Sequence, residues 1–173
     1  MTLRVVDPHM HLWDLSHLHY SGLEAQSENF LGDYSGMVKT YLLHDFLMEA
    51  GDIIVEKVVH VETIIDEGDR LAETEWLQGI ADKDGFPQGI VCCVDLSDHD
   101  ARKFLEAQVA FRNVRGVRQV LNRHDNSLYN YTDTDYMSDP VWQRNFGLLA
   151  EFGLTFDLQL YPHQMQAAAD LAA

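Results

Sequence analysis

Hydrophobic positions along the chain gather in short, nearly continuous runs that alternate with segments of helical period. Each run is bounded by glycine or polar residues, and runs of this kind predict strands. We expect strands at residues 3–7, 57–63, 89–96, 115–121 and 154–161. Because several runs are apolar on both faces, they favour parallel strands that helices cover on both sides.

The intervening segments carry apolar residues three and four positions apart, which predicts amphipathic helices. Asp139 and Pro140 give one of these helices an N-cap followed by proline at its first position, and Gly153 gives it a C-terminal cap. Repeated strand–helix units predict right-handed parallel crossovers, and hence an α/β fold. Two architectures fit, an open doubly wound sheet or part of a (β/α)8 TIM barrel. The expected helices span residues 38–50, 69–81, 101–111 and 139–152.

Composition restricts the class of partner. The chain has 173 residues with no repeat or linker, so we expect a single domain over residues 1–173. Lysine and arginine total 12 against 28 acidic residues, a formal charge of −16, which disfavours nucleic acid and anionic membrane surfaces as partners. No apolar stretch reaches the length of a membrane span. The absence of a secretory-signal pattern, and the adjacency of Cys92 and Cys93, favour a cytoplasmic protein.

Two histidines follow the first predicted strand and are separated by one residue. Residues i and i+2 of a strand face the same side, so His9 and His11 can converge on one point. This geometry suits a divalent metal, or a substrate oxygen that two imidazoles would hold. The alternative is a hydrogen-bonded pair that only caps the strand.

Further polar residues lie near the carboxyl ends of the other predicted strands, where a barrel gathers its active site. Arginine at such a place suits an anionic substrate, because the guanidinium group pairs with carboxylates in two-pronged fashion. For Arg118 the alternative is a salt bridge to Asp95 or Asp157. His60 and Glu62 could pair to fix a histidine tautomer, or form a structural ion pair. The full set is His60, Glu62, Arg118, Arg123, Asp157, Gln159, Tyr161 and His163.

Two segments without clear period, residues 14–37 and 122–138, follow strands of this expected site. Both are therefore candidates for its walls or for a lid.

The segment Asp7-Pro8-His9-Met10-His11-Leu12-Trp13-Asp14 resembles the opening of the amidohydrolase superfamily, and more narrowly the amidohydrolase-2 branch of predicted metal-dependent TIM-barrel hydrolases. That branch includes sugar lactonases and 2-pyrone-4,6-dicarboxylate lactonase. Four later segments are similar in order: HVET, GIVCCVDL, VRGVRQVLN and LTFDLQLYPHQ. The resemblance implies a (β/α)8 TIM barrel of which this chain holds about the first five β/α units. We therefore expect an N-terminal fragment, open at one sheet edge and hence dimeric or prone to aggregation.

The resemblance also implies site residues. His9 and His11 would be catalytic, and would be the metal ligands if a metal is bound. Arg118, Arg123 and Tyr161 would contact substrate, and we add Asp157 as an orienting partner in the same pocket. The implied cofactor is one divalent, zinc-like ion, with a metal-independent site as the alternative, because the lactonases in question can work without a tightly bound ion.

The function implied is hydrolysis of a lactone or related ring ester of a small carboxylate or sugar acid by activated water. In the family a histidine from strand six and an aspartate from strand eight complete the site, and the aspartate activates the water. Neither segment is among the 173 residues, so we expect this chain alone to be inactive. The alternatives are a non-oxidative decarboxylase of the same superfamily, and a non-catalytic half-barrel that associates with a partner chain. A homo-oligomer is compatible with the hydrolase and with both alternatives.

Overall fold

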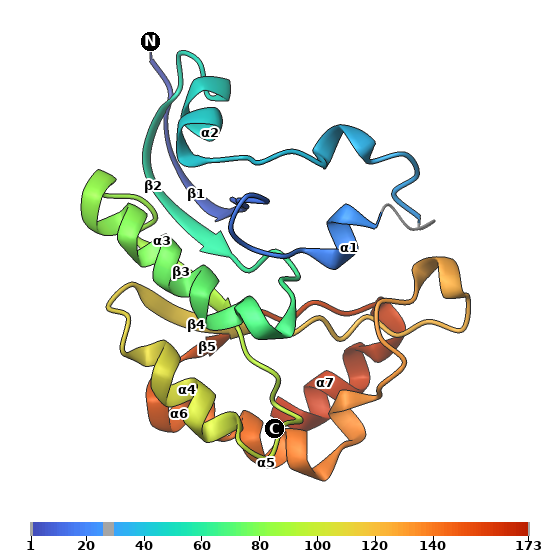
Figure 1. Ribbon diagram of the computed structural model, residues 1–173. Coiled ribbons are helices and arrows are strands. Elements are labelled where there is room, and N and C mark those ends of the chain that lie inside the picture. Colours follow the sequence, from blue (N-terminus) through green and yellow to red (C-terminus); the bar gives the residue numbers. More distant parts are fainter. Residues whose placement is uncertain (1, 26–29, 173) are drawn as a thin grey trace.

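The fold is a curved sheet of five parallel strands with helices along its outer side (Figure 1). The computed structural model describes residues 2–25 and 30–172. The strand order in the sheet is β1-β2-β3-β4-β5, the same as the order along the chain, which is how a (β/α) barrel grows. The prediction of a partial TIM barrel is confirmed. The strands are β1 Arg4–Met10, β2 Ile54–Val61, β3 Gly89–Cys93, β4 Val114–Arg118 and β5 Thr155–Phe156.

The connections carry the helices that the apolar period predicts, together with short 3-10 turns. Figure 1 shows α3, α4, α5 and α6 following the curve of the sheet. No helix of the described residues is long and apolar enough to cross a membrane. The α-helices are α1 Ser21–Glu24, α2 Leu43–Glu49, α3 Arg70–Asp84, α4 Ala101–Val109, α5 Pro140–Phe146, α6 Leu148–Phe152 and α7 Met165–Ala172. The 3-10 helices are η1 Ser35–Met37, η2 Glu67–Asp69, η3 Ser127–Tyr129, η4 Tyr136–Ser138 and η5 Pro162–Gln164.

Several boundaries differ from the sequence prediction. The helix expected over 38–50 begins only at Leu43, because Tyr41 forms an antiparallel bridge with Trp13. The helix expected over 139–152 is divided into α5 and α6 at Gly147. The strand expected over 154–161 is reduced to two residues, since only Thr155 and Phe156 are in register with β4. β1 runs on through Met10, so His9 lies within the strand and not after it.

The hydrophobic core lies between the sheet and the outer helices. Trp142 of α5 is fully buried there, stacks on Phe146 with ring centroids 5.0 Å apart, and donates its indole N–H to Gln119. The two cysteines are free thiols, and burial raises the pKa of each, which agrees with a role in the core. This packing holds the strands in place, and it therefore determines the positions of the side chains at their carboxyl ends. The core also contains Leu12, Val58, Leu77, Ile90, Leu96, Leu105, Val117 and Leu121.

Candidate functional site

His9 of β1 and His11, which directly follows that strand, converge at the carboxyl end of the sheet. Their Nε2 atoms lie 3.1 Å apart, and the ring planes stand at 78° to each other. The Nδ1 atom of His11 is 2.7 Å from the Val61 carbonyl oxygen. Because a carbonyl only accepts, Nδ1 of His11 carries a proton, and the Nε2 lone pair of a neutral ring then faces His9. The structure thus brings together the pair that the sequence predicts.

The charge state of His11 suits this geometry. Burial, reinforced by the nearby positive charge of Arg118, lowers the pKa of His11 to about 4. The ring is therefore neutral at pH 7, the form in which imidazole binds a metal ion. A divalent ion of the zinc type needs more than two protein ligands, and no group of three His, Cys, Asp or Glu side chains in the described ranges could hold one. The residues present fit such an ion as two of its ligands.

Arg118 at the end of β4 forms a buried ion pair with Glu62 at the exit of β2. Its Nε donates to Glu62 Oε1 over 2.6 Å, and both side chains are less than one tenth exposed. A second guanidinium nitrogen donates to the Glu62 backbone carbonyl, and a third donates to Gln159 Oε1 at 3.0 Å. The pairing of Arg118 with Asp95 or Asp157 that the sequence left open is wrong.

The expected pairing of His60 with Glu62 is also wrong. Glu62 turns to Arg118, whereas the His60 ring bonds to the Leu12 carbonyl oxygen at 3.2 Å. An anionic ligand that reached Arg118 would share its guanidinium group with Glu62 and Gln159. A substrate contact at Arg118 stays a prediction.

Two residues that sequence reasoning missed complete the buried polar group. Glu73 of α3 is 1% exposed and accepts a hydrogen bond from the Tyr20 hydroxyl at 3.2 Å. Burial, together with the negative charge of Glu62, raises the pKa of Glu73 to about 8. One ionised carboxylate, one protonated carboxyl group and one guanidinium group therefore balance in charge at neutral pH. Glu73 could have been recognised in the sequence, because it lies four positions before Leu77 and therefore on the apolar face of α3.

We expect the stability of the chain to fall as the pH rises from 6.5 to 8, because folded Glu73 keeps a proton that the unfolded carboxyl has already lost. Unfolding then releases a proton, so a higher pH favours the unfolded state, by up to about 1.4 kcal/mol per pH unit. Glu73→Gln copies the protonated carboxyl and should flatten this slope. Urea unfolding at pH 6.5, 7.25 and 8 measures it. The control is Glu75→Gln on the exposed face of α3, and a slope that Glu73→Gln leaves unchanged would contradict the assignment.

The turn after β2 is strained. Ile64 has a φ angle of 55°, and its N–H donates to Glu62 Oε2 at 2.6 Å. The left-handed region is unfavourable for a β-branched residue, and such conformations persist where the surroundings impose them. The Glu62–Arg118 pair thus fixes both β4 and the path of the chain out of β2.

Ile64→Asn should raise the free energy of unfolding by about 1 kcal/mol, because asparagine tolerates the left-handed region and Ile64 is half exposed. Ile53→Asn is the matched control, since Ile53 has similar exposure without a positive φ. Thermal and urea unfolding of both variants decide between strain and simple loss of apolar surface. Equal destabilisation of the two variants would show that Ile64 stores no strain.

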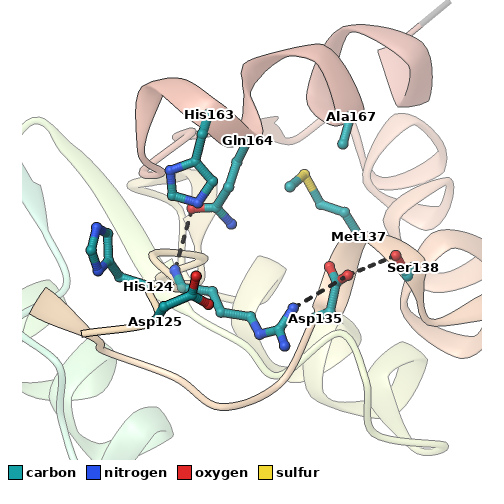
Figure 2. A pocket seen from close by; sticks show the side chains of 9 residues that line it. His124, Asp125, Asp135, Met137, Ser138, His163, Gln164 and Ala167 are labelled. Atoms are coloured by element: carbon teal, nitrogen blue, oxygen red, sulfur yellow. Dashed lines mark hydrogen bonds and ion pairs between the residues drawn. The ribbon is translucent and has the colours of Figure 1, made fainter. Parts of the chain in front are cut away.

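Arg123 lies apart from Arg118, in a pocket of about 390 Å³ between the loop over 122–138 and the start of α7. Figure 2 shows His124 and His163 at one side of this pocket and Asp135 and Ser138 at the other. The Arg123 guanidinium is 3.8 Å from Asp135, with both side chains about half exposed. Such a long, solvated ion pair leaves Arg123 available to another anion.

Tyr161 connects this pocket to the surrounding loops. Its hydroxyl donates to the Tyr129 carbonyl at 2.5 Å, and its ring lies 5.6 Å from that of His124. Phe30 of the first loop packs on Tyr129 and bonds through its N–H to Leu128. The two loops expected to form walls therefore meet, although residues 26–29 of the first loop lie outside the described residues.

Asp157 and Gln159 are two positions apart in the strand expected over 154–161, but their side chains have different surroundings. The N–H of Asp157 continues the ladder to Val117 at 2.9 Å, and its side chain is half-buried. Gln159 turns its side chain to Arg118. Asp157 therefore lies in the segment that leads to Tyr161, whereas Gln159 is the residue that accepts a hydrogen bond from Arg118 of the buried ion pair.

No family model matches this sequence. The chain is 40% identical over 172 residues to the uncharacterized protein y4mH of Sinorhizobium fredii, a match that covers 98% of this chain and 58% of that protein. The chain thus spans little more than half the length of the curated relative that it matches.

Several solved structures are similar in fold, and three of them are amidohydrolases. Amidohydrolase 2 from Bifidobacterium longum subsp. infantis matches with a TM-score of 0.61 at 18% identity, over 98% of this chain and 57% of that chain. An amidohydrolase from Burkholderia multivorans solved with bound HEPES gives 0.65 at 19% identity, over 98% and 52%. The same enzyme with bound zinc gives 0.66 at 18% identity, over 97% and 52%. The described chain therefore has the fold of about half of an amidohydrolase-type barrel.

Proposed function

We propose that this chain is the His-x-His-bearing half of an amidohydrolase-2-type hydrolase that opens a lactone or related ring ester of a small carboxylate or sugar acid. The observation that carries the proposal is the convergence of His9 and His11, whose Nε2 atoms are 3.1 Å apart at the carboxyl end of β1. Catalytic groups of (β/α) barrels gather at that end of the strands.

The histidine pair would polarise the carbonyl group of the ring ester. With Nδ1 of a neutral His11 on the Val61 carbonyl, the Nε2 proton of the pair belongs to His9, which can donate it to a substrate oxygen. Alternatively both Nε2 atoms would hold a divalent ion, which supplies a Lewis acid for the carbonyl. The zinc bound by the Burkholderia multivorans amidohydrolase supports the second form.

Recognition of the acid group is proposed for Arg123 and Tyr161, whose backbone N–H groups both donate to Gln164, with Asp157 in the segment that leads to Tyr161 and Arg118 as the deeper cation. Arg123 lines a pocket, and among the described residues the ion pair of its guanidinium group is the long one to Asp135. Arg118, in contrast, already bonds to Glu62 and Gln159. The position of Arg123 therefore favours it as the primary anchor of a carboxylate.

The rest of the barrel would supply the group that activates water. Both outer strands of the described sheet, β1 and β5, pair on one side only. Exposed apolar residues lie in β1 and next to both strands: Val6 in β1, Leu3 directly before it, and Leu158 shortly after β5. Unpaired strand edges of this kind invite pairing with another strand. This observation favours a second candidate function, in which the half-barrel serves to associate with a partner chain or with a second copy of itself.

The test is an assay of sugar-acid lactones and pyrone carboxylates with a protein in which this chain is part of a closed barrel. Ring opening releases one proton per turnover and no carbon dioxide, so a pH-stat and a carbon dioxide trap are run together. Carbon dioxide release would replace the hydrolase by the decarboxylase. If neither product forms, and native mass spectrometry shows this chain in a stable complex, the association function is supported instead.

A further inference from the structure

His60 lies in β2 beside the end of β1, with its side chain fully buried. The parallel register pairs it with Met10, so its ring stands next to the point where β1 leaves the ladder. Its Nε2 atom is 3.2 Å from the Leu12 carbonyl oxygen and must carry the proton, because a carbonyl only accepts. The Thr63 hydroxyl gives the same oxygen a second, longer hydrogen bond of 3.4 Å.

This bond mirrors the one that His11 makes. The His11 ring donates from Nδ1 to the Val61 backbone at 2.7 Å, whereas the His60 ring donates to the backbone of Leu12, the residue directly after His11. Each strand end thus sends one imidazole to the backbone of the other. We propose that His60 is a positioning residue for His11. By holding the peptide that follows His11, it keeps Nδ1 of that ring on Val61 and Nε2 turned to His9.

The second nitrogen of His60 argues that the imidazole does more than fill space. Its Nδ1 atom is buried and, within residues 2–25 and 30–172, has no hydrogen-bond partner. An unpaired buried acceptor is unfavourable, and a leucine would occupy a similar volume without one. The His11 ring lies edge-on, with centroids 6.2 Å apart, so the two rings only pack. What the imidazole adds is the Nε2 donor.

The consequence for the site rests on the proposed function, but the geometric claim can be tested without it. Three variants of the 173-residue chain separate the possibilities: H60Q, whose amide N–H can still reach the Leu12 carbonyl, H60N, whose amide is too short, and H60L. Long-range ¹H–¹⁵N NMR of the imidazoles at pH 7.5 reports which nitrogen of His11 carries the proton. A Zn²⁺ titration against a chromogenic chelator reports the affinity of the histidine pair.

We expect the wild type and H60Q to hold His11 as a single Nδ1–H tautomer, and H60N and H60L to show a mixture. The affinity for Zn²⁺ should fall by about tenfold or more in H60N and H60L, the usual effect of removing a group that orients a metal-binding histidine, and should be largely kept in H60Q. H99Q, at an exposed histidine, is the matched control and should change neither readout. T63V removes the longer bond to Leu12 and should have a smaller effect than H60N.

Equal behaviour of folded H60N and H60Q would overturn the proposal, as would an unchanged His11 tautomer in H60L. If H60L does not fold, the comparison of H60N with H60Q decides in the same way. Failure of all three variants to fold would give His60 a purely structural role and would also overturn it. Two histidines are an incomplete ligand set for Zn²⁺, so a wild type without measurable Zn²⁺ affinity leaves the decision to the tautomer measurement, which by itself upholds or overturns the role of His60.

Discussion

Arg118→Met is expected to lower the free energy of unfolding by about 3 to 5 kcal/mol, because it leaves the Glu62 carboxylate buried without its cation. Glu62 is 1% exposed and Arg118 is 6% exposed, and the guanidinium group also bonds to Gln159. Methionine has nearly the volume of the arginine stem, so the loss measures the missing charge more than a cavity.

Urea unfolding of Arg118→Met beside Arg102→Met provides the comparison. Arg102 forms a 2.7 Å ion pair with Glu151, but both side chains are about half exposed, and pairs of that kind contribute about 1 kcal/mol or less. Equal losses in the two variants would show that burial gives the Glu62–Arg118 pair no special weight. The double variant Arg118→Met/Glu62→Gln should recover part of the stability, since no unpaired charge remains.

Glu62→Gln alone should lower the free energy of unfolding less than Arg118→Met does. The positive charge of Arg118 acts on Glu73, and the negative charge of Glu62 is what helps to keep Glu73 protonated. Without Glu62 the pKa of Glu73 should fall, so that this carboxyl ionises and replaces the lost partner. We therefore expect the buried group to tolerate loss of the Glu62 carboxylate better than loss of the Arg118 cation.

The sequence was a good guide to the strands and to His9 and His11, because both depend on local periodicity. Alternation along one strand is enough to place residues 9 and 11 on the same face. The partner of Arg118 depends instead on how β2 and β4 are placed relative to each other across β3, and Glu62 is 56 positions away along the chain. The sequence therefore suggested Asp95 and Asp157, which are closer to Arg118 along the chain.

Segments whose ends are set by contacts with distant parts of the chain were predicted less well. The run at 154–161 has strand character throughout, but only two of its residues meet β4 in register. The pocket around Arg123 is built from an aperiodic loop and the start of α7, and no spacing rule brings such segments together. Glu73 could have been found, because a carboxyl group on the apolar face of a helix must be paired or protonated.

His11→Asn separates the structural role of His11 from its proposed chemistry. The Nδ2 group of asparagine takes the place of Nδ1 and can still donate to the Val61 carbonyl, the 2.7 Å bond that joins β1 to β2. The variant lacks any atom at the position of Nε2, which faces His9 at 3.1 Å. We therefore expect the free energy of unfolding to change by no more than about 1 kcal/mol, the contribution of one adjusted hydrogen bond.

Turnover of a lactone by the closed barrel should in contrast fall by about 10² to 10³-fold, the usual effect of removing one group that stabilises a developing oxyanion. The same substitution at His44, an exposed histidine of α2, controls for histidine loss in general. The measurement is kcat/KM together with urea unfolding for both variants. His11→Asn that keeps turnover within tenfold of wild type would remove the histidine pair from the reaction, whereas a parallel loss of stability and activity would make His11 a structural residue. Only a selective loss of turnover agrees with the proposal that one ring nitrogen of His11 serves the fold and the other serves the substrate.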